Sequence, residues 1–344
     1  MGVICSGGSL LAGGAGRTDL LGDEHTRSLA HAQWRSVNRL LETLDERTVV
    51  LPTHGFGSFC AATPIAGGDP DELTIGHERT RNSATRLEAD DYVENMIANL
   101  PPIPRYYRHM APLNRAGGRP FELGTLKRVP LDSLEREIVG AGFVIDVRPR
   151  RVFARQHRRG AWNLELGPNL ATYLGWVVPY FAPFTLIAEG EDDIDRARAA
   201  LARIGRETVA AWASSEELER NGPGVGSYPV ATFADLGVIT RNSGSPEIID
   251  VRHPAEWRAG HLRDARHVPL PELTNVRATL PDDQPIWVHC AAGFRAAVAS
   301  SMLASAGRSP VLVDDVFEHA ALAGLEIESG DVSVPGAIPD RVRP

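Results

Sequence analysis

A single cysteine stands between an apolar run and a predicted helix in the stretch WVHCAAGFRAAVAS, residues 287–300. A thiolate at that position would face the backbone N–H groups and the positive dipole end of the helix, which favour an anion. Gly293 and the two alanines before it leave room for the backbone to curl around the sulfur, and Arg295 adds a permanent positive charge. The pattern predicts a nucleophilic Cys290 in a loop that holds an anion or a sulfur atom carried on the cysteine. The alternative is a buried, inert Cys290, the usual fate of an isolated cysteine.

The chain matches itself at an offset of 104 residues, where VIDVRPRRVFARQHRRGAWNLEL (144–166) aligns without a gap with IIDVRHPAEWRAGHLRDARHVPL (248–270). The aligned positions carry the same kinds of side chain: Asp146 and Asp250, Arg148 and Arg252, Phe153 and Trp257, His157 and His261, Ala161 and Ala265, Leu166 and Leu270. Each copy continues with an apolar strand, at 183–190 and at 285–293, and then a helical segment. The order strand, helix, strand, helix predicts an α/β fold with two parallel-sheet domains that carry helices on both faces.

Glycine- and proline-rich segments divide the chain. NGPGVGSYP (221–229) separates the two copies, and NRAGGRP (114–120) precedes the first. We therefore expect three domains, at 1–113, 120–220 and 228–335. A chain of 344 residues with 43% hydrophobic and 23% charged residues can bury several cores.

Composition argues against several classes of function. The formal net charge of −8 and the lack of a Lys/Arg block argue against a nucleic-acid partner. No apolar run approaches the ~18 residues of a membrane helix, so we expect no membrane partner. Three cysteines without CxxC spacing favour a reducing, cytoplasmic location. MGVICS formally fits a myristoylation pattern, but a buried strand at Val3, Ile4 and Cys5 is the preferred interpretation.

Three segments of the second copy resemble the rhodanese family of sulfurtransferases: IDVR (249–252), EWRAGHLRDARHVPL (256–270) and HCAAGFRA (289–296). The resemblance spans residues 130–215 and 230–330 and implies tandem rhodanese domains. It implies that Cys290 takes up a sulfane sulfur as a persulfide and that Arg295 is the second catalytic residue, which stabilises the anionic donor and the persulfide. The loop that binds the substrate would be lined by Ala291, Ala292, Gly293 and Phe294. It also implies that Asp250, Arg252 and His261 brace the sheet and the loop.

Loop length separates two chemistries on this architecture. Phosphatases that resemble it place five residues between the cysteine and the arginine, whereas four residues separate Cys290 from Arg295. The shorter loop favours sulfur transfer. One departure from the family pattern is Asp264, where rhodaneses usually have glycine, and it matters little for the chemistry.

The first copy lacks these catalytic residues. Its strand is followed by Glu189 at the expected cysteine position, and EGEDDI (189–194) carries four carboxylates, with Ile194 near the expected arginine position. Such a loop would repel a thiolate or thiosulfate. We expect a catalytically silent domain that packs against the neighbouring site or shapes it.

The first 113 residues resemble a different family. GAGRTDLLG (14–22), VVLPTHGFGSFC (49–60) and IGHERTRN (75–82) are similar to the C-terminal half of metallo-β-lactamase-fold proteins of the persulfide dioxygenase-like branch. The resemblance implies a partial αββα unit whose metal-binding histidines would precede this chain. Gly8 stands where the family has a ligand aspartate, and His54 is a weak remnant of a ligand position.

This resemblance implies no required cofactor, because one ligand cannot hold a metal. Iron or zinc is expected only if a missing N-terminal half is supplied. Half of such a sandwich exposes a sheet face, on which the missing half-domain or a second copy of the chain could dock.

Three functions fit these observations. The leading hypothesis is a sulfurtransferase that moves sulfur from thiosulfate or a low-molecular-weight persulfide to a thiol or cyanide through Cys290, with a small-molecule sulfur donor and a thiol acceptor as partners. The second is a truncated persulfide dioxygenase-like metallo-hydrolase. The third is a non-catalytic sulfur carrier or scaffold, with Trp176, Tyr180 and Phe181 either at an inter-domain surface or, as is usual for aromatic residues, in a core.

Overall fold

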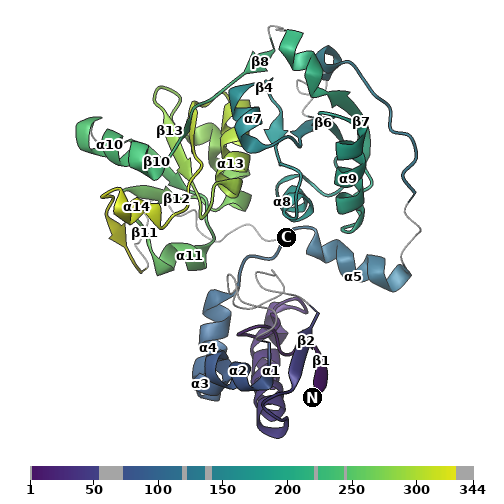
Figure 1. Cartoon of the computed structure of the whole chain (residues 1–344), viewed down its shortest axis with the longest axis vertical. Helices are drawn as coiled ribbons and strands as arrows, with labels where there is room; N and C mark the ends of the chain where they lie inside the picture. The colour runs from purple at the N-terminus through teal and green to yellow at the C-terminus, as the bar shows by residue number, and fades with distance from the viewer. Residues whose placement is uncertain are drawn as a thin grey trace. The chain divides into compact units, whose positions relative to one another are not determined.

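A computed structural model describes residues 2–53, 73–117, 122–135, 142–220, 224–243 and 246–330. The chain forms two compact units, Met1–Ile103 and Pro104–Pro344, and many of their elements are labelled in Figure 1. The first elements of the second unit are helix α5 (Tyr107–Ala116) and a short 3₁₀ turn, η2 (Leu131–Ser133).

The first unit pairs two parallel strands and packs them against helices. Its elements are β1 (Val3–Gly7), α1 (Asp23–Thr43), β2 (Val49–Pro52), α2 (Ile75–Arg81), α3 (Ser83–Arg86) and α4 (Ala89–Asn99). Ile4 pairs with Val50, and both lie in the core with α1 and α4.

The expected burial of the first strand is wrong for two of its residues. Val3 is 61% exposed and Cys5 is exposed, because alternate residues of a strand face opposite sides and no described element covers this side of β1 and β2. Leu51 on β2 shares that side and is 51% exposed. The open apolar face agrees with the expectation of a partial sandwich.

The first copy of the repeat forms a four-stranded parallel sheet in the order β5-β3-β6-β7. Its elements are β3 (Phe143–Asp146), α7 (Arg150–Arg155), β4 (His157–Arg158), β5 (Trp162–Asn163), α8 (Leu170–Val177), β6 (Phe184–Ala188), α9 (Glu191–Ala202), β7 (Val209–Ser214), η3 (Ser215–Arg220) and β8 (Val225–Gly226). The short strands β4 and β8 pair antiparallel outside the sheet.

The second copy forms a five-stranded parallel sheet in the order β12-β10-β13-β14-β9. Its elements are β9 (Val230–Ala231), α10 (Phe233–Ser243), β10 (Glu247–Asp250), α11 (Pro254–Ala259), β11 (His261–Leu262), β12 (Ala265–His267), η4 (Leu270–Glu272), α12 (Leu273–Val276), η5 (Arg277–Thr279), β13 (Ile286–His289), α13 (Phe294–Ser305), β14 (Pro310–Val313), α14 (His319–Leu322) and β15 (Ile327–Glu328). β11 and β15 pair antiparallel, as β4 and β8 do in the first copy.

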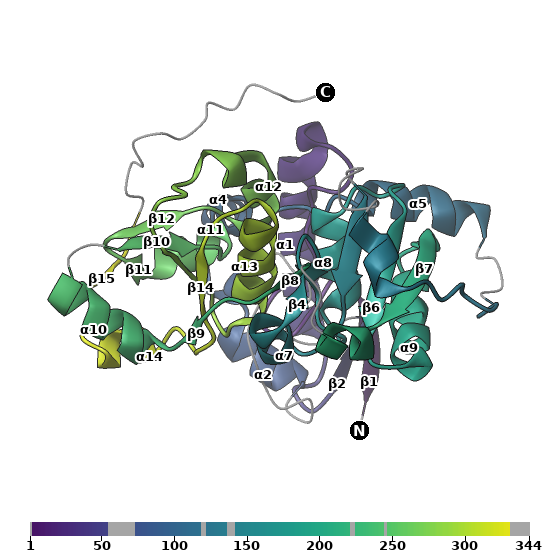
Figure 2. The same ribbon diagram turned by 90° about the horizontal axis from the view of Figure 1, so that it is seen from above.

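The two sheets have the same core topology, since β5-β3-β6-β7 corresponds strand for strand to β12-β10-β13-β14. The α/β prediction with two parallel sheets is confirmed. Helix α13 joins the copies: Ser301 and Ser305 accept hydrogen bonds at 2.8 and 2.9 Å from the Asn163 backbone N–H and the Trp162 indole of the first copy. Residues 295–303 of α13 are all buried, and most of them are small or apolar, as expected for a helix enclosed by its neighbours (Figure 2).

Candidate active site

Cys290 follows directly on the central strand of the second sheet. Strand β13 lies between β10 and β14, and all four of its residues are buried, as is usual for an inner parallel strand. Cys290 itself is 1% exposed. It lies where parallel strands end and a helix begins, the usual position of ligand and catalytic groups in such sheets.

The loop from Cys290 to α13 is held in shape by its own backbone. Gly293 has φ of +84°, a conformation that favours glycine, and a Cβ there would overlap Asp314 Oδ1. The Phe317 backbone N–H donates to the Ala291 carbonyl at 3.0 Å. The Ala297 N–H donates to the Gly293 carbonyl at 2.9 Å, so the N–H groups of the preceding helical residues have no acceptor within α13. These N–H groups are the anion-binding end of the helix.

Arg295 is bound by a carboxylate that the sequence analysis did not single out. Its Nη1 and Nη2 donate to the two oxygens of Glu256 at 2.5 and 2.7 Å. Burial acts to lower the pKa of Arg295, but the hydrogen bonds to Glu256 and the neighbouring negative charges together raise the pKa overall. Burial acts to raise the pKa of Glu256, and Arg295 lowers it on balance. Both groups therefore stay charged beside the cysteine loop.

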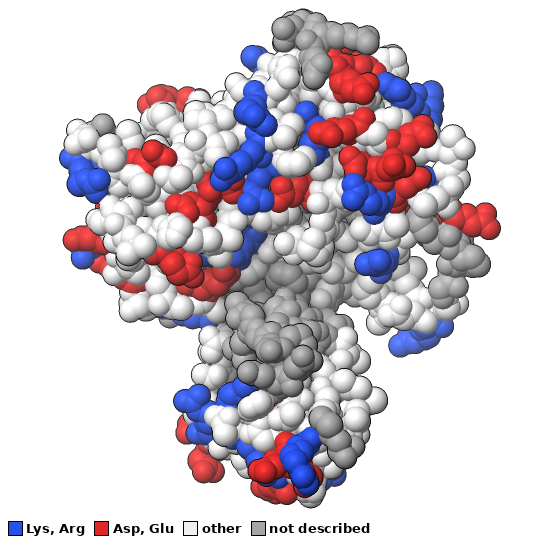
Figure 3. All heavy atoms as spheres, viewed as in Figure 1, with Lys and Arg blue, Asp and Glu red and all other residues white. Residues whose placement is uncertain are grey.

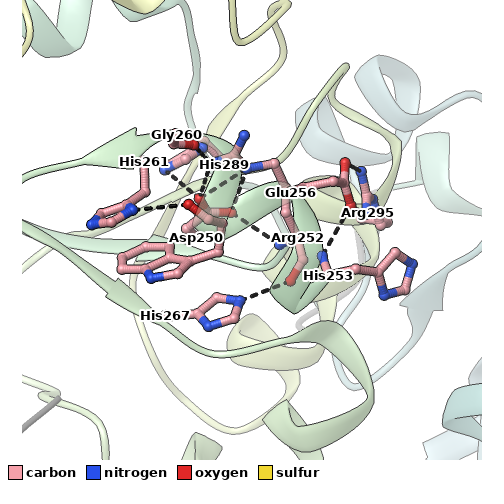
Figure 4. A network of polar contacts seen from close by, with 10 residues as sticks. Asp250, Arg252, His253, Glu256, Gly260, His261, His267, His289 and Arg295 are labelled. Atoms are coloured by element: carbon pink, nitrogen blue, oxygen red, sulfur yellow. Dashed lines mark hydrogen bonds and ion pairs between the residues drawn. The ribbon is translucent and has the colours of Figure 1, made fainter. Parts of the chain in front are cut away.

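The predicted bracing residues form one network behind the loop (Figure 4). The Arg252 guanidinium binds both oxygens of Asp250, with a closest contact of 2.6 Å, and donates to the Gly260 carbonyl at 2.7 Å. Burial opposes ionisation of Asp250, yet its charged and hydrogen-bonding neighbours lower its pKa overall. His261 stacks on Trp257 with ring centroids 3.8 Å apart, and its Nδ1 lies 2.9 Å from the Trp257 carbonyl. The network fixes the end of β10 beside the cysteine.

His289, directly before Cys290, is fully buried. Its Nε2 lies 3.8 Å from Asp250 Oδ2, and its ring contacts Phe233 and Phe317. Burial lowers the pKa of His289, and the neighbouring Asp250 only partly opposes this. The imidazole is therefore neutral near pH 7.

Helix α8 of the first copy lies against this loop. The Tyr173 ring is 5.2 Å from the Phe294 ring, and the Trp176 ring is 5.2 Å from His253, the residue before α11. Burial raises the pKa of Tyr173 to about 12, and the charges of Arg295, Glu256 and Cys290 also act on it. Trp176 is thus buried in the interface between the two copies, whereas Phe181 is 73% exposed to solvent.

Two arginines of the first copy reach the end of β14. The Arg150 Nε lies 2.7 Å from Asp314 Oδ1, and Arg151 binds the other oxygen of the same carboxylate. Glu165 also binds Arg150. Since Asp314 packs on Gly293, this ion-pair cluster supports the cysteine loop from the side of the first copy.

The loop of the first copy is one residue shorter than the cysteine loop. Asp146 pairs with Ile187 as Asp250 pairs with His289, so Ala188 occupies the cysteine position. Our assignment of that position to Glu189 is wrong by one residue, because strand pairing and not the strand's last apolar residue sets the register.

The arginine position of the first copy is also corrected. Ile194 N–H donates to the Gly190 carbonyl as Ala297 N–H donates to Gly293, so Asp192 corresponds to Arg295. Ile194 is 2% exposed and belongs to the core. An aspartate thus stands where the second copy has its arginine, which strengthens the expectation that this copy is silent.

The functional residues that sequence analysis missed are Glu256, Tyr173, Arg150 and Asp314. One sequence feature could have identified Glu256, namely its position in the first turn of α11. There it accepts a hydrogen bond from the His253 backbone N–H at 3.0 Å, which is half of a capping box. The other three contact the site only through tertiary structure.

The first unit shows no grouping of metal ligands among the residues that the structure describes. His25 and His31 lie beside Glu24 and Asp90, and no cluster of three potential ligands forms in the described ranges. His54 and Cys60 fall outside those ranges. The potential metal ligands among the described residues therefore do not fit a metal centre.

Within the described residues, no helix combines the length and the apolar character needed to cross a membrane. On the face drawn in Figure 3, acidic and basic side chains are interspersed over the second unit.

Residues 238–318 match the family of rhodanese-like domains. Over 92 residues the chain is 33% identical to the HTH-type transcriptional regulator Rv0324 of Mycobacterium tuberculosis, covering 26% of this chain and 41% of that protein. Over 61 residues it is 33% identical to YqhL of Bacillus subtilis, covering 18% of this chain and 48% of that protein. The matches therefore span less than half the length of these curated relatives.

Among solved structures, a metallo-β-lactamase from Staphylococcus aureus is similar in fold, with a TM-score of 0.50 and 21% identity over 62% of this chain and 58% of that one. Together with the rhodanese-like match, this likeness confirms the predicted combination of rhodanese and metallo-β-lactamase folds.

Proposed function

Residues 238–318 form a rhodanese-like domain, and from this premise we propose that the chain is a sulfurtransferase in which Cys290 carries the transferred sulfur. The observation that carries the proposal is the position of Cys290 between β13 and the N-terminus of α13, within the loop of a rhodanese-like domain. The proposed donor is thiosulfate or a low-molecular-weight persulfide, and the acceptor is a thiol or cyanide.

The reaction has two displacement steps. In the first, the Cys290 thiolate attacks the outer sulfur of thiosulfate, the sulfur–sulfur bond of the donor breaks, and sulfite leaves with the bonding electron pair. In the second, the acceptor thiolate or cyanide attacks the outer sulfur of the Cys290 persulfide. The persulfide bond breaks, the acceptor keeps the sulfur, and the thiolate of Cys290 is regenerated.

The surroundings of Cys290 support a bound anion. The N–H groups at the start of α13 and the positive end of its dipole favour negative charge on the donor and on the persulfide. The Arg295 charge is largely balanced by Glu256 at 2.5 Å, so we propose that it orders the loop and adds a modest attraction for the donor. Asp250, Arg252 and His261 are proposed to hold the strand end in place.

A variant pair tests the proposal. Wild type, Cys290→Ser and Cys5→Ser would be compared for thiocyanate formation from thiosulfate and cyanide. Cys5 is exposed and lies in the other unit, which makes it a matched control for loss of a thiol. We expect the wild-type rate for Cys5→Ser and a loss of at least about three orders of magnitude for Cys290→Ser. Equal turnover in all three proteins would refute the proposal.

A further inference from the structure

A cavity of about 1540 Å³ opens at the first copy, away from the cysteine. It reaches Arg148, Glu189 and Ser215, which follow the carboxyl ends of β3, β6 and β7. This is the edge of the sheet at which the second copy carries Cys290. On the other side the cavity reaches Ala304 and Ser305, at the far end of α13 from the cysteine loop, so the two sites are separate.

A buried arginine lines this cavity where the second copy has a core leucine. At the offset of 104 residues Arg158 corresponds to Leu262, and each pairs with an antiparallel strand, Arg158 with Val225 and Leu262 with Ile327. Leu262 belongs to the hydrophobic core of its domain. The Arg158 side chain is 8% exposed. A guanidinium thus replaces an apolar side chain at an equivalent, buried position.

Among the described residues, the Arg158 guanidinium has little compensation for its charge. Its Nε is buried without a hydrogen-bond partner, and its one ion pair within the described residues is with Glu135 at 3.7 Å. The Glu135 side chain is 76% exposed, so water weakens that pair. Burying a guanidinium with an unsatisfied N–H group and a weak ion pair is costly, and an anion in the cavity would reduce that cost.

A second unpartnered donor lines the same cavity. The Tyr228 hydroxyl is buried with no hydrogen-bond partner among the described residues, and the residue is 7% exposed. Burial raises the pKa of Tyr228, so the hydroxyl keeps its proton and remains a donor. Its ring packs against His157, the residue before Arg158, with centroids 5.4 Å apart.

Further charges line the cavity. Arg155, at the end of α7, is exposed and forms no ion pair with any residue in the described ranges. Figure 3 shows basic side chains over the position that α7 takes in Figure 1. Glu189 and Glu216 also line the cavity, but they are more exposed, and water and salt screen them more than the buried arginine.

We propose that this cavity is a second binding site, which takes a small-molecule oxyanion held by Arg158 and Tyr228, with Arg155 at its edge. The ligand's anionic oxygens accept hydrogen bonds from the Arg158 guanidinium and from the Tyr228 hydroxyl, and so supply the acceptors that both groups lack among the described residues. The site lies in the copy that has no cysteine at its central strand end, so it is a ligand site distinct from the proposed sulfur-transfer centre and does not depend on that activity.

The test measures anion binding by the full chain. Sulfate, inorganic phosphate and acetate would be titrated separately at constant ionic strength, and binding followed by calorimetry and by the melting temperature. The three probes distinguish a preference for tetrahedral oxyanions from one for carboxylates. We expect saturable binding of at least one of them, with a matching rise in melting temperature.

The variants are chosen from the comparison of the copies. Arg158→Leu installs the residue that the second copy uses and should fold, while binding weakens at least about tenfold. Tyr228→Phe removes one donor and should weaken binding about three- to tenfold. Arg196→Leu, on the outer helix α9 with its side chain 69% exposed, is the control and should bind as wild type does.

If Arg158→Leu fails to fold, Tyr228→Phe and Arg155→Gln carry the same test. The proposal is overturned if no probe binds the wild type saturably, or if the cavity variants and Arg196→Leu bind equally well.

Discussion

The two rhodanese-like copies share the hydrogen-bonding network that supports the sheet, and they differ in the loop after the central strand. In both, an aspartate binds an arginine two residues later at 2.6 Å, and that arginine donates to the carbonyl before a histidine, at 3.0 Å to Gln156 and 2.7 Å to Gly260. In both, the histidine stacks on the aromatic residue four positions earlier. The network is therefore part of the fold and does not by itself mark a reactive copy.

The difference lies in the loop that follows the central strand. The second copy has Cys290 to Gly293 before its helix, whereas the first has Ala188 to Gly190 and continues with acidic residues. The first copy has no cysteine at this position. It places Tyr173 against Phe294, Trp176 against His253, and Arg150 on Asp314 beside Gly293. In the proposed mechanism, the second copy carries the sulfur, while the first copy helps to hold the site.

The largest effect is expected from breaking the shared bracing. Asp250→Ala leaves Arg252 buried without its carboxylate and should lower the free energy of unfolding by about 3–5 kcal/mol. Asp146→Ala should cost a similar amount, because the first copy is built in the same way. Urea unfolding of both variants measures this, and a large cost in one copy alone would contradict the equivalence of the two networks.

A histidine present in only one copy should give a pH dependence. Burial lowers the pKa of His253 to about 4, and Pro149 stands at the equivalent position of the first copy. Below about pH 6.5 the unfolded chain takes up a proton that the folded chain does not, so stability falls between about pH 6.5 and 4, by up to about 3 kcal/mol.

His253→Asn should therefore flatten the plot of unfolding free energy against pH in that window, whatever its effect at pH 7. The same substitution at His25, which is 59% exposed, serves as the control. An unchanged slope in His253→Asn would show that the imidazole is not held neutral in the folded protein.

The glycines of the two loops should respond differently. Gly293→Ala places a methyl group on Asp314 Oδ1 at φ +84°, and should cost about 1–3 kcal/mol and most of the sulfur-transfer rate. Gly190 has φ of −152°, and an added methyl group there would meet no described atom within 4 Å, so Gly190→Ala should change little. Melting temperature and turnover of both variants check this, and equal effects would contradict the distinction between the loops.

The smallest effect is expected from the ion pair between the copies. Arg150→Gln removes one of the charges on Asp314 and should cost about 1 kcal/mol, since its side chain is 28% exposed and Arg151 remains. Arg196→Gln, in an exposed pair within the first copy, should cost less. Thermal unfolding of the two variants gives the difference, and no difference would argue that the pair does not couple the copies.

The repeat in the sequence predicted much of this architecture, because similar side chains at a fixed offset occupy equivalent positions in the two copies of the fold. Asp146 and Asp250, or His157 and His261, are matched in this way without knowledge of any contact. The same logic failed at Glu189 and Ile194, since a one-residue shortening of a loop leaves no mark in an ungapped alignment. Strand pairing was needed to place Ala188 and Asp192 correctly.

Other parts of the site were beyond sequence patterns for a different reason. Tyr173 and Arg150 approach the cysteine loop from another domain, more than 100 residues away in the chain, and such contacts have no local periodicity. The exposure of Val3 and Cys5 was missed because the sequence pattern of a short apolar strand predicts burial, whether or not a second layer covers the strand.

The most direct test of the central claim is the mass of the protein after treatment with thiosulfate and removal of excess donor. The account predicts that wild type and Cys5→Ser each gain one sulfur atom, that peptide mapping places it on Cys290, and that cyanide removes it. Cys290→Ser should gain none. A sulfur atom found on another cysteine, or none on the wild type, would contradict the claim that Cys290 carries the transferred sulfur.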